Sequence, residues 1–336
     1  MRKSKLHFIG ILFLVSFASV EAKEINILFM GNSFTFRHNL PELVKQVFEE
    51  GQPELTVNVE RVVYGGQDLF RHHDLYFSES MVRLNSITVA EVETYIERIH
   101  SLKAMKQAPD FYTAYFKRSG LKPGWNRIGK ILGDAAKQQQ KLITRIEAGD
   151  RVKWDYLVLQ SYKDVVDNVD AGYAEYAQKW AKVAEQEGIK VILYITAPHA
   201  QNSAPVSEPL ELTQTEMEME TIHKLVERIK PHAVVPVGLG IKNIQEDGTD
   251  LKFRYRKDAH PSQTSAFLAS NMFYAAFFKE STEGFKYNAV TETKLDGQGK
   301  DPNGDPARVV FDDATKILLQ KAAYDAVIEF NAAGSI

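Results

Sequence analysis

The sequence predicts a doubly wound α/β fold, in which one parallel sheet lies between two layers of helices. Short, nearly continuous apolar segments recur along the 336 residues, as expected for strands buried on both faces. Amphipathic helical segments separate them at the spacing of βαβ units. No internal repeat or linker divides the chain. We therefore expect a three-layer α/β/α sandwich whose central parallel sheet has about five strands.

The predicted strands are short apolar segments that end at a glycine, a proline or a polar turn. In chain order they are residues 24–30, 55–63, 154–160, 190–195 and 233–237. The first ends at Gly31, the second at Tyr64-Gly65-Gly66, and the fourth is stopped by Pro198.

The predicted helices lie between and after these strands. Residues 40–50 have proline at the first turn, where it is tolerated, followed by an apolar stripe. Gly188 ends the helix predicted at 171–187. The other predicted helices are residues 128–148, 213–229, 261–278 and 313–330.

Two segments do not fit the alternation. Residues 77–124 contain helical stretches such as 89–104 and many aromatic residues, so we expect a helical insertion or lid. Most of its aromatic residues are expected to form the insertion's own core, the alternative being a surface that stacks on sugars or covers an acyl chain. The polar, glycine-rich residues 294–306 are expected to form a surface loop.

The N-terminus predicts an exported protein. Arg2, Lys3 and Lys5 precede an apolar stretch at residues 8–15, and Val20-Glu21-Ala22 has the small residues that a signal peptidase recognises. We expect a signal peptide at 1–22 and one mature domain at 23–336, in the periplasm or secreted from a bacterium. An uncleaved N-terminal anchor is the alternative, although the apolar stretch is short for a membrane span.

Composition excludes several classes. The formal net charge is −3, and no basic excess points to nucleic acid. The chain has no cysteine, which excludes disulfides, a thiolate nucleophile and cysteine metal sites. No segment after the signal is apolar enough to span a membrane, so we expect no stable membrane insertion after cleavage.

Polar or glycine residues follow the predicted strands where a doubly wound sheet carries its active groups. Ser33 lies between the first strand and the next helix, whose free amides would stabilise an oxyanion. Gly66 and Gln160, at the second and third strand ends, are candidate oxyanion donors. Near the C-terminus, Asp258 and His260 precede a helix, and a histidine there would activate a serine hydroxyl. Taken singly, each is more simply explained as a helix cap, a turn or a loop residue.

The order of these motifs resembles the SGNH/GDSL hydrolase superfamily. Gly-Asn-Ser-Phe-Thr at 31–35, Gly-Gly-x-x-Leu-x-x-His at 65–72 and Trp-Asp-Tyr-x-Val-Leu-Gln at 154–160 look like an exported bacterial branch of it. The resemblance runs from residue 25 to about 278 and implies a flavodoxin-like hydrolase fold. It also implies Ser33 as nucleophile, His260 as base, Asp258 as orienting acid, and Ser33, Gly66 and Gln160 as the oxyanion hole.

Two positions depart from the family pattern. The family's acid stands three residues before its histidine, where this chain has Lys257, and Asp258 stands two before His260. Asp258 is therefore expected either to take the orienting role after a backbone shift or to leave a Ser–His dyad. The asparagine of the family's third block is also missing, and Gln160 is taken in its place.

Other residues near the strand ends are candidates for the substrate pocket, namely Asn32, His72 and His199. His72, His73 and Asp74 suggest a metal site at first sight, but adjacent residues rarely point at one ion. We expect no metal and no cofactor. His199 is equally explained as a loop histidine.

The resulting prediction is a serine esterase that deacetylates a polysaccharide or another glycan, or cleaves another small ester. One alternative is a decayed hydrolase fold that binds glycans, suggested by Lys257 at the usual acid position. The other is a lipase-type or thioesterase-type acyl hydrolase, which would have a long apolar groove under the insertion.

Overall fold

A computed structural model describes residues 23–334, except 123, 126–127, 198–211, 250, 257 and 259. The predicted signal peptide and His199 lie outside the described residues. Among those residues, no helix combines the length and the apolar character needed to cross a membrane.

Five parallel strands form the central sheet, in the order β2-β1-β3-β4-β5. They are β1 (Lys23–Gly31), β2 (Leu55–Val63), β3 (Tyr156–Gln160), β4 (Lys190–Ile195) and β5 (Ala233–Pro236). The predicted fold class is therefore confirmed, and the predicted strand boundaries agree to within two residues. The early start predicted for β3 came from Trp154, which is buried but donates its indole N–H to the Met81 carbonyl at 2.8 Å.

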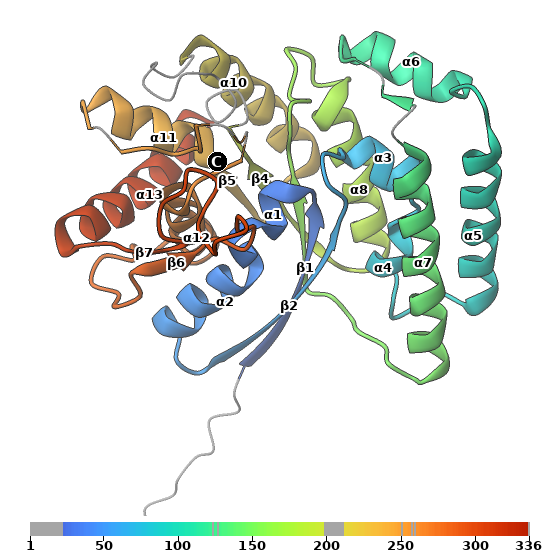
Figure 1. Cartoon of the computed structure of the whole chain (residues 1–336), viewed down its shortest axis with the longest axis horizontal. Coiled ribbons are helices and arrows are strands. Elements are labelled where there is room, and N and C mark those ends of the chain that lie inside the picture. The colour runs from blue at the N-terminus through green and yellow to red at the C-terminus, as the bar shows by residue number, and fades with distance from the viewer. Residues whose placement is uncertain are drawn as a thin grey trace, which may run out of the picture.

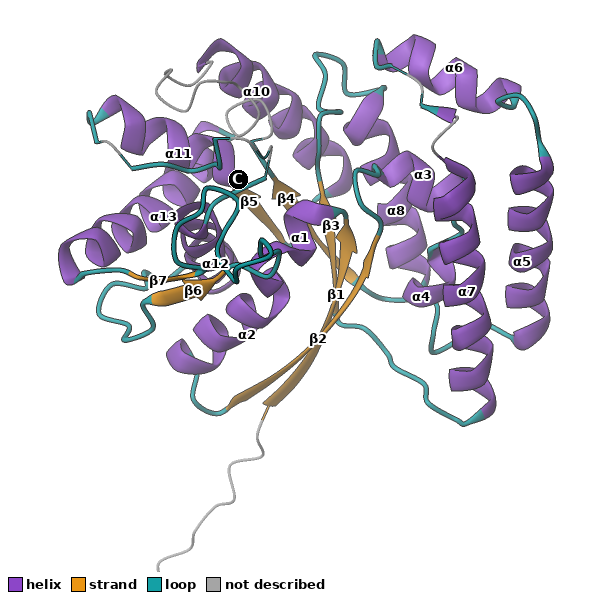
Figure 2. Cartoon of the chain, viewed as in Figure 1, coloured by secondary structure: helices purple, strands orange, loops and turns teal. Residues whose placement is uncertain are grey.

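Helices cover both faces of this sheet, as Figures 1 and 2 show. On one face, α2 packs on β2 and α12 on β5, with α11 and α13 against α12. On the other face, α3 contacts β1 and α8 contacts β4, with α10 against α8. The helices are α2 (Leu40–Gly51), α3 (Leu69–Asp74), α8 (Gly172–Gln186), α10 (Leu212–Ile229), α11 (Val237–Glu246), α12 (Gln263–Phe278) and α13 (Asp313–Ala333).

The insertion is helical, as predicted. It contains α4 (Glu79–Val82), α5 (Val89–Ala104) and α6 (Asp110–Ser119). Helix α5 packs along α7 (Ile128–Glu147), and α6 contacts α8. Tyr112 and Tyr115 are at most 1% exposed, and Tyr115 stacks on Phe70 with ring centroids 4.0 Å apart. Most aromatic residues of the insertion therefore form an internal core, whereas Phe111 remains 43% exposed.

Outside the insertion, helices α3 and α11 and the 3-10 turn Arg37–Asn39 were not predicted, and neither were three further short elements. Helix α1 (Ser33–Phe36) follows β1 directly. Strands β6 (Ala289–Thr291) and β7 (Arg308–Val310) form an antiparallel pair, and the predicted surface loop joins them. Three-residue strands and a single helical turn carry too little periodicity to be recognised in a sequence.

Candidate active site

Helix α1 lies beyond the end of β1 (Figure 1), and Ser33 is its first residue, two positions after the last residue of β1. Asn32 caps this helix: its side-chain oxygen accepts the N–H of Phe34 at 3.1 Å, and its Nδ2 donates to the Gln67 carbonyl at 2.8 Å. Asn32 is 1% exposed and Ser33 7% exposed. Asn32 therefore shapes the turn from inside, where burial keeps it from lining an open pocket.

The side chain of Gln160 holds the same turn through hydrogen bonds. Its Oε1 accepts the backbone N–H of Asn32 at 2.9 Å and the hydroxyl of Thr35 at 2.7 Å, and its Nε2 donates to the Ser161 carbonyl at 2.8 Å. A Cβ on Gly31 would lie 2.4 Å from this Oε1, so only glycine fits there. The oxyanion role of Gln160 stays a prediction, since one of its two amide hydrogens is already donated to Ser161.

His72 is fully buried and contacts the start of the same turn at Gly31. Its Nε2 lies 2.8 Å from the Gly31 carbonyl, and its Nδ1 lies 3.0 Å from the Ser78 hydroxyl. Burial lowers the pKa of His72 to about 4, against a smaller opposing effect of the Gly31 hydrogen bond. The expectation that His72 lines a substrate pocket was wrong, because a neutral, fully enclosed ring with both nitrogens bonded cannot contact substrate.

Two backbone amides at this edge remain available. Within the part of the chain that the structure describes, the N–H groups of Ser33 and Gly66 donate to no backbone or side-chain acceptor. Gly66 is exposed, has a left-handed φ of 68°, and has no atom within 4 Å of an added Cβ. Free amides beside open space suit a developing negative charge on a substrate oxygen.

His260 and Asp258 contact each other through their side chains. His260 Nδ1 meets Asp258 Oδ1, and the backbone N–H of His260 donates to the same oxygen at 3.2 Å. Burial alone would raise the pKa of Asp258, but its contacts with His260 and Arg37 outweigh this effect and hold the pKa well below its usual value. An ionised Asp258 therefore accepts the Nδ1–H of His260 and orients the ring.

Phe34 links the histidine to the serine turn. Its ring centroid lies 5.8 Å from that of His260 and 5.4 Å from that of Tyr162. His260 thus lies beside the residue that follows Ser33, although 227 positions separate the serine and the histidine in the chain (260 − 33). Among the described residues, the Ser33 hydroxyl has no hydrogen-bond partner. Contacts of this kind commonly tighten only when substrate binds.

Sequence reasoning missed three charged residues around this site. Arg37 donates from Nη1 to Asp258 Oδ2 at 3.2 Å and from Nε to Glu292 Oε1 at 2.8 Å. Glu292 follows β6 and is 255 positions from Arg37. Lys294 places its Nζ 3.3 Å from Asp258 Oδ2. No local pattern in the sequence signals these pairs.

The side chains of His72, His73 and Asp74 do not point toward a common position where a metal ion could bind. Within the described ranges, no group of three or more His, Asp and Glu side chains is arranged to hold a metal ion. His73 instead pairs with Asp74 at 2.5 Å, and Tyr176 donates to the other Asp74 oxygen at 2.5 Å.

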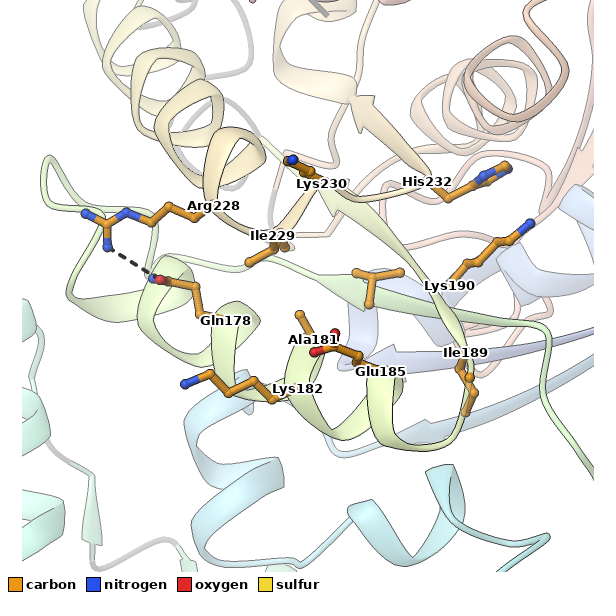
Figure 3. Close-up of a pocket in the computed structure, with 12 residues that line it drawn as sticks. Gln178, Ala181, Lys182, Glu185, Ile189, Lys190, Arg228, Ile229, Lys230 and His232 are labelled. Carbon is orange, nitrogen blue, oxygen red and sulfur yellow. Dashed lines mark hydrogen bonds between the residues drawn. The ribbon is translucent and has the colours of Figure 1, made fainter.

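A basic groove of about 810 Å³ lies at the opposite edge of the sheet (Figure 3). It surrounds the start of β4 at Lys190 and the end of α10 at Ile229. Active groups in doubly wound sheets lie beyond the carboxyl ends of the strands, so this groove is separate from the candidate site.

Searches for a related family gave no match among protein-family models, and no curated protein matches the chain. Three solved structures are similar at low identity. A DUF4886 family protein from Bacteroides uniformis is 14% identical, with a TM-score of 0.48 over 91% of this chain and 95% of that one. A suggested SGNH hydrolase from Slackia heliotrinireducens is 15% identical, with a TM-score of 0.40 over 75% and 98%. A gut microbial diltiazem-metabolizing enzyme is 10% identical, with a TM-score of 0.36 over 76% and 47%. At these scores the likeness says nothing about function, which must come from the site itself.

Proposed function

We propose that the protein is a serine hydrolase that cleaves carboxylic esters. Ser33 is the nucleophile, His260 the general base and Asp258 the orienting acid. One observation carries the proposal: the His260–Asp258 pair lies against Phe34, the residue next to Ser33 at the carboxyl edge of the sheet. The Asp258 contact favours a triad over a dyad.

The reaction proceeds in two halves. Ser33 Oγ attacks the ester carbonyl carbon while His260 Nε2 takes the hydroxyl proton. The amides of Ser33 and Gly66 stabilise the oxyanion. The intermediate then collapses, His260 returns its proton to the leaving alkoxide, and the alcohol departs. Water, deprotonated by His260, then attacks the acyl-enzyme. The second tetrahedral intermediate collapses, His260 gives its proton to Ser33 Oγ, and the carboxylic acid departs. No cofactor enters this scheme.

The substrate that we propose is an acylated carbohydrate, with acetyl as the acyl group. The motif resemblance and the predicted export support this choice. The half-buried ring of Tyr162 beside Phe34 also supports it, because an aromatic ring next to the reacting groups suits contact with a sugar face. Long acyl chains would need an extended apolar groove at this edge.

The test uses residues 23–336 with p-nitrophenyl acetate and with a fluorophosphonate probe that labels activated serines. We expect Ser33→Ala and His260→Ala to lower kcat/KM by about 10³-fold or more, and Ser33→Ala to abolish labelling. Asp258→Ala should keep part of the activity. Ser101→Ala is the matched control, because Ser101 lies exposed on α5 and bonds only to its own helix at the Glu97 carbonyl.

Each outcome has a clear meaning. Wild-type hydrolysis no faster than that of Ser33→Ala would overturn the proposal and favour a glycan-binding protein on a hydrolase fold. A comparison of acetyl with decanoyl esters separates the carbohydrate esterase from the lipase-type alternative. N-terminal sequencing of the protein recovered from the cell envelope or medium tests export.

A further inference from the structure

Arg37 bridges two carboxylates behind the candidate base. Its side chain is 1% exposed and forms a fork with Glu292, through Nε to Oε1 at 2.8 Å and Nη2 to Oε2 at 2.5 Å. Its remaining Nη1 reaches Asp258 Oδ2 at 3.2 Å. Such a fork fixes the plane of the guanidinium, so the position of Nη1, and with it that of Asp258, is also fixed.

Glu292 is held in turn by donors from three other residues. Its Oε2 accepts from the hydroxyl of Tyr255 at 2.7 Å and lies 3.1 Å from Nε2 of His38, and its Oε1 accepts the backbone N–H of Lys294 at 2.7 Å. Burial alone would raise the pKa of Glu292, but the bonds from His38 and Arg37 outweigh it and keep the carboxyl ionised.

The backbone that carries Arg37 is itself unusual. His38 and Asn39 have left-handed φ values of 56° and 53°, which residues with a Cβ rarely adopt. Strained turns of this kind persist where the surroundings over-determine them, often at functional sites. Here the turn brings Arg37 and His38 together onto Glu292, between the serine helix and the segment after β6.

The charged groups beside the His260 ring have a net negative sum. Arg37 contributes +1, and Asp258 and Glu292 contribute −1 each, so these three groups together carry a net charge of −1. Burial lowers the pKa of His38 more than Glu292 raises it, which leaves that ring neutral. The titratable groups around these three include His38, Tyr255, the buried Asp301 and the 64% exposed Lys294.

We propose that Arg37 and Glu292 are positioning residues that hold Asp258 against His260 and set the net negative charge behind the ring. The inference rests on the proposed ester hydrolysis. Glu292 is essential to it because an uncompensated Arg37 would draw Asp258 away from the histidine and cancel its charge. Arg37 and Glu292 are each 1% exposed, so we assign them a positioning role without contact with substrate.

Two substitutions that change the charge behind the His260 ring in opposite directions provide the test, with the pH profile of kcat/KM as the measurement. Glu292→Gln brings the net charge to zero and disfavours a protonated ring, so the acidic limb of the kcat/KM profile should move to lower pH. Arg37→Met makes the net charge −2 and should move that limb to higher pH. Each shift should be about 1 pH unit, for one buried charge acting over a few ångströms at a protein dielectric. A loss of about 10-fold to 100-fold should fall on kcat, with KM little changed.

The double variant Arg37→Met/Glu292→Gln restores the net charge of −1 and leaves no buried charge unpaired, so it is the variant best able to fold. Its acidic limb should return to the wild-type position, although kcat stays low. Thr291→Val, an uncharged change at the exposed last residue of β6, should leave the profile in place. Single variants that shift in the same direction, or a double variant that stays displaced, would overturn the inference.

An NMR titration of the His260 ring, assigned with His260→Gln, separates this inference from the proposed function. The titration measures how the charge behind the ring affects proton binding by His260, whether or not the protein hydrolyses esters. If Ser33→Ala shows that the esterase proposal fails, opposite displacements of the ring titration in the two single variants would still support the charge arrangement. The absence of both displacements would refute it even in an active enzyme.

Discussion

His72 gives a prediction that connects the serine turn to the pH dependence of stability. The ring is fully buried between the Gly31 carbonyl and the Ser78 hydroxyl. In its neutral form Nε2–H donates to Gly31 and Nδ1 accepts from Ser78. Burial lowers its pKa in the folded protein from 6.5 to about 4, so the unfolded chain binds a proton more readily than the folded one.

The size of the effect follows from this difference. Stability from the neutral ring is fully present above pH 6.5 and is lost as the pH falls toward 4. The complete loss is 6.5 − 4, or about 2.5 pH units, which corresponds to about 3.4 kcal/mol. Between pH 7.5 and pH 4.5, where the folded ring is still mostly neutral, the loss amounts to about 2.5 kcal/mol.

Urea unfolding of wild type and His72→Gln at these two pH values measures it. Glutamine can still donate an amide hydrogen toward Gly31 but does not titrate. Other titrating groups, including Asp258 and Glu292, act equally in both proteins and cancel in the comparison. The free energy of unfolding of wild type should therefore fall by about 2.5 kcal/mol more than that of His72→Gln.

Equal losses in the two proteins would refute this reasoning. So would a variant with unchanged stability and a raised KM, which would return His72 to the pocket-lining role that the sequence suggested. Circular dichroism at pH 7.5 controls for misfolding of the variant.

The remaining predictions concern the turn, the oxyanion site and a buried acid. In Gly31→Ala the added Cβ would lie 2.4 Å from the buried carboxamide oxygen of Gln160. This variant should lower the free energy of unfolding by about 3 kcal/mol and weaken fluorophosphonate labelling. The control Gly129→Ala, whose added Cβ would have no atom within 4 Å, should do neither. Gly66 and Gly188 have left-handed φ values of 68° and 70°, so alanine at either position should lower the free energy of unfolding, measured by thermal unfolding, by about 1 kcal/mol. Only Gly66→Ala should lower kcat, because only the Gly66 amide is assigned to the oxyanion. Burial and the charge of a nearby aspartate raise the pKa of Asp164 to about 7, so this group destabilises the fold as pH rises from 3.8 toward 7. Asp164→Asn should therefore raise the free energy of unfolding by about 2 to 4 kcal/mol at pH 8 and change it little at pH 4, and an equal gain at both pH values would contradict the assignment.

The sequence by itself determined the fold class. The inner strands of a parallel sheet are buried on both faces, so β1, β3 and β4 appear as nearly continuous apolar segments with readable ends. The first residue of α5, at 89, was also readable, because Thr88 and Glu91 form a capping box. Ser33 and His260 became candidates because each follows a strand or precedes a helix, where polar groups gather in such folds.

The tertiary structure decided what each candidate residue contacts. His72 and His260 are both histidines near a strand end, yet one is enclosed and the other is 23% exposed beside an aspartate. The Arg37–Glu292 fork could not be anticipated, since it joins the turn after α1 to the residue that follows the three-residue strand β6 near the C-terminus. Local sequence patterns report periodicity and capping over a few residues. Burial and charge pairing across 255 positions arise only when the chain has packed.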